Sequence, residues 1–284
     1  GAIANIVLDP LFIFMLNLGI RGAAIATVLS QCLSAGFVLY FLSKKAEYKV
    51  RLLYKEEIRT CGKDAKNIVS LGTAGFVMQL TNSLVSICCN NVLSATGGDV
   101  YVSVMTIISS VRQMIETPIW SISEGSSPVI SYNYGAKRPK KVIEAWITMS
   151  VLALIYSLIA WSVILFAPKF LIGIFSSDKS LMIDTVPAMK LYFSAFIFML
   201  FQYTGQTMFK SLNKKKQAIF FSILRKVIIV VPMTYMFPYV FHMGSNGVFM
   251  AEPVSNVIGG SLCFIVMLLT VLPELKQMNS DLSS

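Results

Sequence analysis

Charged side chains occur inside an apolar stretch of the sequence, and their spacing places them together. Arg112, Glu116 and Glu124 follow one another at intervals of four and eight residues between Val100 and Ser131. On an ideal helix, with about 100° of rotation per residue, all three fall within an arc of about 120°. Charges at membrane depth are costly and usually face an interior cavity. The spacing therefore predicts a polar face lining a water-filled cavity, although Arg112 and Glu116 could also simply neutralise each other at i,i+4.

Two prolines in this stretch support the cavity interpretation. Pro118 and Pro128 each leave a backbone carbonyl one turn earlier without its helical donor. Freed carbonyls at membrane depth need protein groups or cavity water as partners. We expect Glu124 to be the exchangeable acid of the cavity, and Arg112 with Glu116 to form a structural pair that could also act as a gate.

Amides and a further acid on other apolar segments are candidates for the same cavity. The amides between residues 67 and 95 share a helical face with small residues, so close packing of helices is an alternative explanation for that face. Those between residues 187 and 209 could equally form hydrogen bonds between helices. The candidate residues for binding a substrate or ion are Gln79, Asn82, Asn90, Arg112, Gln113, Glu116, Glu124, Gln202, Gln206 and Glu252.

The sequence contains no recognisable motif for catalysis or for metal binding. It has no phosphate-binding glycine loop, no paired-histidine zinc motif and no nucleophilic serine elbow. We therefore expect no enzyme activity, no metal site and no cofactor. Carboxylates in a low-dielectric cavity can bind a cation or a proton reversibly, so Na⁺ or H⁺ is the expected coupling ion.

The composition is that of a helical membrane protein. Hydrophobic residues make up 55% of the chain and charged residues 13%, with a mean hydropathy of +0.69. A soluble domain carries about 25% charged residues, and repeated apolar segments of helical length favour an all-α polytopic bundle over a barrel. The net charge of +10 comes largely from basic residues between the apolar segments. We therefore expect contact with membrane lipid headgroups and no nucleic-acid partner.

The loops between the apolar segments indicate the topology. Most Lys and Arg residues follow the second, fourth, sixth and eighth segments, which the positive-inside rule places in the cytoplasm together with the C-terminus. Arg225 and Lys226 lie near the cytoplasmic end of the seventh segment, where snorkelling of the charged heads is the simplest explanation. The eight segments are 1–16, 22–42, 67–95, 100–131, 142–167, 187–209, 217–237 and 248–272.

The second and eighth segments begin alike. Gly22–Gln31 and Gly247–Asn256 carry Gly, Ala, Ser and an amide at the same offsets, and each follows a proline-bearing segment and a glycine-containing loop. A chance match between two small-residue helices is the alternative. Both copies enter the membrane from the same side, so the repeat is parallel. Six segments then form one unit and the intact protein has twelve, which fits a chain that starts at Gly1 in mid-pattern.

Three stretches resemble the multidrug and toxic compound extrusion (MATE) family. Asn5–Thr27 resembles the fifth-to-sixth helix signature of that family, Glu124–Ala136 its eighth-helix and cytoplasmic-loop pattern, and Ala218–Arg225 with Pro232 its eleventh helix. The resemblance implies helices five to twelve of a two-lobe helical bundle. The expected divisions are 1–45 as the last two helices of the N-terminal lobe, 46–66 as a basic cytoplasmic linker, 67–272 as the complete six-helix C-terminal lobe, and 273–284 as a cytoplasmic tail.

Members of the family exchange organic cations or other toxic compounds for inward Na⁺ or H⁺. The resemblance thus implies a secondary active exporter of drug-like small molecules in a bacterial cytoplasmic (inner) membrane, with no obligate protein partner. Some members place coupling acids in the seventh and tenth helices, where this chain has amides, and others use an Asp in the first helix, which this chain lacks. The coupling site therefore stays open, and this chain by itself is expected not to transport.

Two other functions remain open. A related flippase for lipid-linked oligosaccharides or precursors would need a larger basic cavity to hold phosphates. Arg112 is the only cation expected at depth, which argues against a flippase. A non-transporting membrane scaffold would give no reason for a long buried polar face.

Overall fold

The computed structural model describes residues 1–45 and 62–281, and every element within them is helical. The all-α class expected from the sequence is therefore confirmed. The chain divides into two compact units, Gly1–Asn67 and Ile68–Ser284, each with its own packing. The expected linker falls largely outside the described residues, and its last five positions, 62–66, are helical at the start of α4 (Gly62–Gly135).

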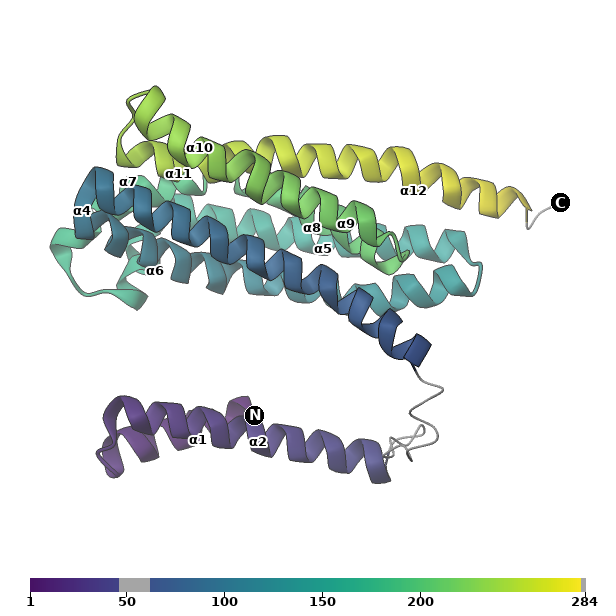
Figure 1. The fold of residues 1–284 in the computed structure, drawn as a ribbon, viewed down its shortest axis with the longest axis horizontal. Coiled ribbons are helices and arrows are strands. Elements are labelled where there is room, and N and C mark those ends of the chain that lie inside the picture. Colours follow the sequence, from purple (N-terminus) through teal and green to yellow (C-terminus); the bar gives the residue numbers. More distant parts are fainter. Residues whose placement is uncertain (46–61, 282–284) are drawn as a thin grey trace. The chain divides into compact units, whose positions relative to one another are not determined.

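The first unit contains a helical hairpin. α1 (Ala2–Pro10) continues into a π-helical turn, η1 (Leu11–Met15), and α2 (Gly19–Lys44) returns beside it (Figure 1). The two arms approach so closely at Gly22 that a Cβ there would lie 2.6 Å from the carbonyl oxygen of Phe12. Gly22 therefore sets how closely the two helices cross.

α4, whose residues from Ile68 onward belong to the second unit, consists of two long helical segments joined at a glycine. Within α4, Gly98 has φ 69° and ψ −170°, a conformation that side chains with a Cβ rarely adopt. The chain reverses at this residue, and the segments 62–97 and 99–135 run back past one another (Figure 1). These two segments correspond to the third and fourth apolar segments expected from the sequence.

Four helices follow α4 along the chain. α6 (Pro168–Phe175) has eight residues and is too short to cross a membrane. α7 (Lys179–Tyr192) begins with a side-chain cap, because the Asp178 carboxylate accepts hydrogen bonds from the backbone nitrogen and hydroxyl of Ser180 at 2.8 and 2.7 Å. These bonds hold the pKa of Asp178 below its usual value. The helices are α5 (Pro139–Phe166), α6 (Pro168–Phe175), α7 (Lys179–Tyr192) and α8 (Phe196–Ser211).

A bend separates α7 from α8, where the sequence predicts one apolar span. The two helices meet at an angle of 51°. At the bend the Phe193 carbonyl accepts a hydrogen bond from the Phe196 backbone nitrogen at 3.1 Å and a second one from the Trp161 indole nitrogen at 2.9 Å. The second bond joins α5 to the bend, and we expect it to stabilise the bend.

The remaining chain forms two composite helices, 215–240 and 245–281, in which α-helical and π-helical turns alternate. Each π segment contains a proline or lies within three residues of one, where the regular hydrogen-bond pattern cannot continue. The elements are α9 (Lys215–Ile223), η2 (Leu224–Val230), α10 (Val231–Tyr235), η3 (Met236–Val240), α11 (Ser245–Ser255), η4 (Asn256–Gly260) and α12 (Ser261–Asp281). α12 thus extends through most of the segment expected to be a tail.

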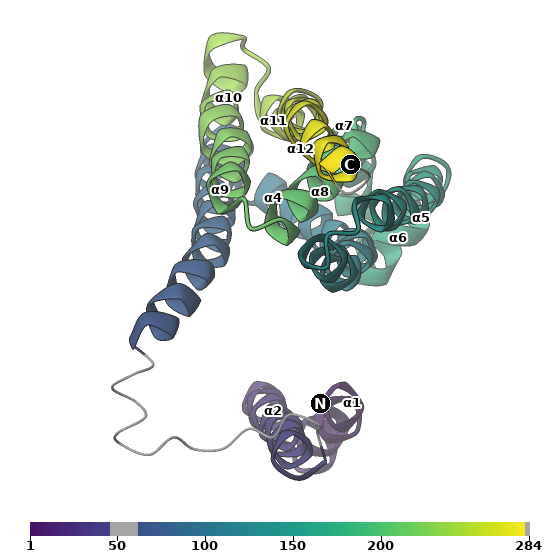
Figure 2. The ribbon, with the colours of Figure 1, turned by 90° about the vertical axis from the view of Figure 1, so that its right-hand side faces the viewer.

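The first composite helix lies beside the first segment of α4 in both ribbon views (Figures 1 and 2). The Cys89 sulfur contacts the Thr234 hydroxyl at 3.8 Å across this boundary. α8 lies at the centre of the unit, and most of its residues are buried. Helices pack closely at Gly260, where a Cβ would lie 2.5 Å from the Phe198 carbonyl oxygen.

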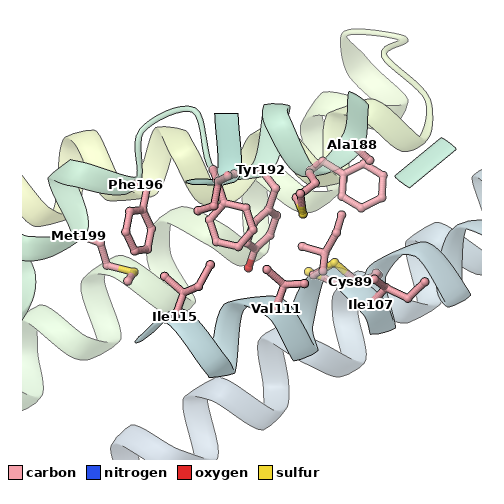
Figure 3. Packing of buried hydrophobic residues seen from close by; sticks show 14 of the residues in the cluster. Cys89, Ile107, Val111, Ile115, Ala188, Tyr192, Phe196 and Met199 are labelled. Carbon is pink, nitrogen blue, oxygen red and sulfur yellow. The ribbon is translucent and has the colours of Figure 1, made fainter. Parts of the chain in front are cut away.

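An apolar core fills the space between α4, α7 and α8. Figure 3 shows Val111 and Ile115 facing Tyr192, Phe196 and Met199. The Phe193 ring packs edge-on against the Tyr192 ring and the Phe196 ring, with centroid distances of 5.2 and 5.7 Å. This packing holds one face of the second α4 segment against α7 and α8, which leaves the adjacent polar face of the same segment for a cavity.

The internal repeat expected from the sequence has a counterpart in the backbone. In both copies a hydrogen bond closes the turn, from Leu18 N to Phe12 O at 3.2 Å and from Met243 N to Phe237 O at 3.1 Å. The features that recur at an offset of 225 residues are the π segments η1 and η3, the left-handed residues Asn17 and His242, the left-handed glycines Gly19 and Gly244, and the close-contact glycines Gly22 and Gly247. A chance match of small residues does not explain this agreement.

Five helices in the described residues are long and apolar enough to cross a membrane, and a sixth span results when α7 and α8 are counted together. One of the five runs from Gln79 to Gly135 and includes the reversal at Gly98. Ala2–Met15 is apolar but shorter. All eight apolar segments expected from the sequence are therefore helical.

Candidate functional site

Most of the polar candidates from the sequence line a single cavity in the second unit. Its volume is about 520 Å³, which is within the range of drug-sized ligand sites. The two segments of α4, together with α7, α8, η2 and α11, supply its walls. Eight of the ten candidates line it, namely Gln79, Asn82, Arg112, Gln113, Glu116, Gln202, Gln206 and Glu252.

Glu252 is the centre of the charged groups in this cavity. It is 4% exposed, and its Oε1 pairs with the guanidinium groups of Arg112 and Arg225. The Lys226 ammonium donates to Oε1 at 3.2 Å and to Oε2 at 3.4 Å. Three cations from two helices therefore share one buried carboxylate, which offsets the cost of removing that carboxylate from water.

Arg112 connects this group to a second carboxylate. Its Nε donates to Glu116, the i,i+4 partner that the spacing predicts, and one terminal nitrogen lies 3.0 Å from Glu252. The other terminal nitrogen donates to the Tyr192 hydroxyl at 2.6 Å. The Tyr203 hydroxyl donates to Glu116 at 3.1 Å. Arg112 thus bridges both acids of the cavity and is itself held by α7.

Two of the cations were not expected at the site. The sequence places Arg225 and Lys226 near a membrane interface, but the structure buries both and they line the cavity. The sequence does contain a signal for this arrangement, because Glu252 is the only acid of the eighth apolar segment and needs a buried partner. The snorkelling interpretation is therefore wrong for both residues.

Glu124 lies outside the cavity, contrary to the expected position of the exchangeable acid. It pairs with Lys210 at 2.9 Å, and the two side chains are 39% and 35% exposed. Glu124 shares a helical face with Arg112, but twelve residues of helix separate them by about 18 Å along the axis. A shared face therefore did not place the two residues at the same depth.

Asn90 also lies outside the cavity. Its neighbour Cys89 is buried and lines the cavity, whereas Asn90 is exposed. Successive residues of a helix differ in direction by about 100°, so the two side chains point to different sides. The polar face expected on this segment contacts the cavity only through Gln79, Asn82 and Ser86.

Two polar atoms of buried cavity residues have no hydrogen-bond partner among the residues that the structure describes. They are Nε of Arg225 and Oε1 of Gln202, and each residue is 4% exposed. Buried polar groups are nearly always paired, so unpaired ones at a cavity indicate where a bound molecule or water would be held. Among the residues that the structure describes, no three His, Cys, Asp or Glu side chains gather closely enough to hold a metal ion.

The sequence matches a family model and several characterised relatives. The MatE family model matches residues 75–236. "Multidrug export protein MepA" of Staphylococcus aureus (strain NCTC 8325 / PS 47) is 26% identical over 272 residues, which are 94% of this chain and 57% of that protein. The protein of the same name from Staphylococcus saprophyticus is 26% identical over 277 residues, 95% of this chain and 58% of that protein. The chain thus spans less than two thirds of the length of these relatives, which are export proteins and not enzymes.

Solved structures share the fold. A crystal structure of MATE in complex with MaL6 aligns with a TM-score of 0.84 and 23% identity, covering 98% of this chain and 61% of that one. A MOP superfamily transporter from Pyrococcus furiosus, described as having a binding pocket of reverse polarity, aligns with a TM-score of 0.85 and 23% identity, covering 97% and 61%. The expected fold is therefore confirmed.

Proposed function

Because the chain belongs to the MatE family of multi-pass membrane transporters, we propose that the full-length protein exports drug-like molecules in exchange for Na⁺ or H⁺ by alternating access. The relatives named as multidrug export proteins support the substrate class. The staphylococcal relatives support a bacterial cytoplasmic membrane location, and the distribution of basic residues supports a cytoplasmic C-terminus.

The observation that carries this proposal is the position of Glu252. A buried carboxylate shared by three cations can exist in two states, paired with them or bound to a proton or Na⁺. Binding of the coupling ion weakens the attraction of Glu252 to Arg112, Arg225 and Lys226. These residues come from different helices, so the change in pairing favours a different helix arrangement.

Glu116 is the second carboxylate available for coupling. It lies on the same chain of contacts through Arg112, and Tyr203 holds its other oxygen. A change of charge at either acid therefore reaches the other through Arg112. Glu124, paired with Lys210 outside the cavity, is not part of this chain of contacts.

The test is substrate-driven dissipation of a Na⁺ or pH gradient by the full-length protein in liposomes. We expect Glu252→Gln to lower gradient-coupled export roughly tenfold or more, which corresponds to about 1.4 kcal/mol. Glu124→Gln is the matched control, because it also removes one paired acid from the bundle but lies outside the cavity. Glu252→Asp, which keeps the charge, should retain part of the coupling.

Unchanged coupled export in folded Glu252→Gln protein would refute the assignment. The amount of each variant recovered as a monodisperse, folded species in detergent separates a loss of coupling from a loss of structure. Substrate flux that proceeds without any gradient would refute antiport itself. Absence of substrate-dependent flux in the unmodified protein would favour the scaffold.

A flippase for lipid-linked saccharides is a second candidate, favoured by one observation. Three cations line the cavity, whereas the sequence indicated one cation at depth. The structural neighbour from Pyrococcus furiosus is described as having a pocket polarity that suggests a different function. Transbilayer movement of a lipid-linked pyrophosphate saccharide in the same liposomes, in place of drug export, would favour this candidate.

A further inference from the structure

The cavity has more basic than acidic side chains. Arg112, Arg225 and Lys226 line it, and Glu116 and Glu252 are the carboxylates among its described lining residues. With each group in its usual charge state at neutral pH, one positive charge is in excess. An uncompensated charge is costly in a low-dielectric interior. The excess can be removed by an anion that enters the cavity or by loss of the Lys226 proton.

The hydrogen bonding of Arg225 favours the anion. One terminal nitrogen of its guanidinium pairs with Glu252, while Nε has no partner. Loss of the Lys226 proton would balance the charge, but it would leave this buried donor unpaired. A bound anionic group would balance the excess charge, and its acceptor oxygens would pair Nε of Arg225. Charge-assisted bonds from a guanidinium are among the stronger hydrogen bonds in proteins.

The backbone beside Arg225 holds it in this position. A Cβ on Gly259 would lie 3.0 Å from both Cβ and Cγ of Arg225, so the glycine allows the arginine stem to pack directly against η4. With the stem packed in this way, the guanidinium is fixed at the cavity wall and does not extend toward a membrane interface. A fixed donor loses little conformational freedom when it binds an acceptor.

We propose that the cavity binds its substrate through an anionic group of sulfonate, carboxylate or phosphate type, which accepts hydrogen bonds from Arg225 and Lys226. The inference rests on the proposed function and narrows the substrate class to organic anions and zwitterions. Glu252 is the counter-ion of Arg112, Arg225 and Lys226, and the anionic group shares these cations with it. Trp120, 53% exposed and lining the same cavity, offers an aromatic surface for the body of the molecule.

A matched pair of probes tests the charge requirement. Isothermal titration calorimetry would measure binding of naphthalene-1-sulfonate and of its neutral analogue naphthalene-1-sulfonamide to the full-length protein in phosphatidylcholine nanodiscs. We expect the sulfonate to bind roughly tenfold more tightly, since it adds charge-assisted hydrogen bonds to the same aromatic body. Equal affinities, or tighter binding of the sulfonamide, would overturn the proposal without any variant.

Variants then locate the subsite. Arg225→Met should reduce the affinity for the sulfonate to that for the sulfonamide. Lys210→Met removes a cation that pairs with Glu124 outside the cavity, and should keep the tenfold preference. If Arg225→Met does not fold, Arg225→Lys keeps the charge but lacks Nε, and should lower the preference. An unchanged preference in a folded Arg225 variant would overturn the assignment.

Export and binding measured on the same protein separate this inference from the proposed function. A change of nanodisc lipid identifies the source of the anion. Gradient-coupled export of ethidium without any sulfonate preference would refute the anion subsite and leave the exporter in place. Sulfonate binding without gradient-coupled flux of any probe would refute the exporter and leave the subsite in place. Weaker binding of the sulfonate in phosphatidylglycerol nanodiscs than in phosphatidylcholine nanodiscs would assign the same subsite to the headgroup of a lipid with net negative charge.

Discussion

Glu252 and Glu124 show how burial decides what an ion pair contributes. Glu252 is buried with its partners, so removing this carboxylate would leave buried cations uncompensated and cost about 3–5 kcal/mol. Glu124 and Lys210 are more than a third exposed, and such pairs contribute about 0–1 kcal/mol. Arg112–Glu116 could be predicted because both residues are on one helical turn. The pairs of Glu252 with Arg225 and Lys226 join different helices, so they could not be predicted from local spacing.

Two tryptophans on α5 allow a test of the bend between α7 and α8. Trp161→Phe removes the indole hydrogen bond to the Phe193 carbonyl, which keeps its bond from the Phe196 backbone nitrogen, and should lower stability by about 0.5–1.5 kcal/mol. Trp146→Phe makes the same change in side-chain size, but the Trp146 indole nitrogen has no hydrogen-bond partner among the described residues. This variant should therefore lose less stability than Trp161→Phe. Thermal unfolding of both full-length variants in detergent measures the difference. Equal losses would show that the Trp161 bond does not stabilise the bend.

At the scale of elements, glycines and prolines decide the shape of the bundle. Glycine permits the reversal at Gly98 and the close helix crossings at Gly22, Gly247 and Gly260. Prolines accompany all four π segments in the described residues. The sequence predicted which segments are helical, because hydropathy at helical length is a local signal. It did not predict the 51° bend, where Trp161 of a different helix donates a hydrogen bond to the Phe193 carbonyl.

The close crossings make a clear prediction for glycine substitutions. A Cβ on Gly247 would lie 2.7 Å from the backbone nitrogen of Pro238, so Gly247→Ala should push the two helices apart and cost about 1–3 kcal/mol. A Cβ on Gly125 would have no neighbour within 4 Å, so Gly125→Ala should be neutral or stabilising by up to about 1 kcal/mol. The fraction of each full-length variant that remains monodisperse after heating measures the effect. Similar losses in both variants would contradict the close crossing at Gly247.

At the scale of the whole molecule, the topology follows from charge and helix length. α5 has 28 residues and spans about 42 Å, enough to place its two ends on opposite sides of a membrane. The basic loop before α5 is expected in the cytoplasm, and the loop between α6 and α7 outside. The sequence predicted this alternation, the repeat and the family. The set of residues that line the cavity could be predicted only in part. Sharing a helical face does not determine how far along the helix axis a residue lies, and Glu124 lies outside the cavity for this reason.

Impermeant thiol reagents would test this orientation in whole cells. Lys140→Cys, in the first turn of α5, should be protected from a reagent added outside and become labelled after the cells are opened. Ser177→Cys, exposed between α6 and α7, should be labelled from outside. The unmodified protein gives the background from its own cysteines. Labelling of both positions from the same side would contradict a membrane-crossing α5.

The constant offset of the two turns pairs Glu252 with Thr27. In both copies a serine three residues later bonds the backbone carbonyl of that residue, Ser30 to Thr27 at 2.9 Å and Ser255 to Glu252 at 3.1 Å. This is the pattern expected when an ancestral gene duplicates and the backbone joint is retained while its side chains diverge. The backbone joint is therefore the same in both copies, whereas the second copy has an acid where the first has a threonine. The charge at this position can thus change without altering the turn that the two copies share.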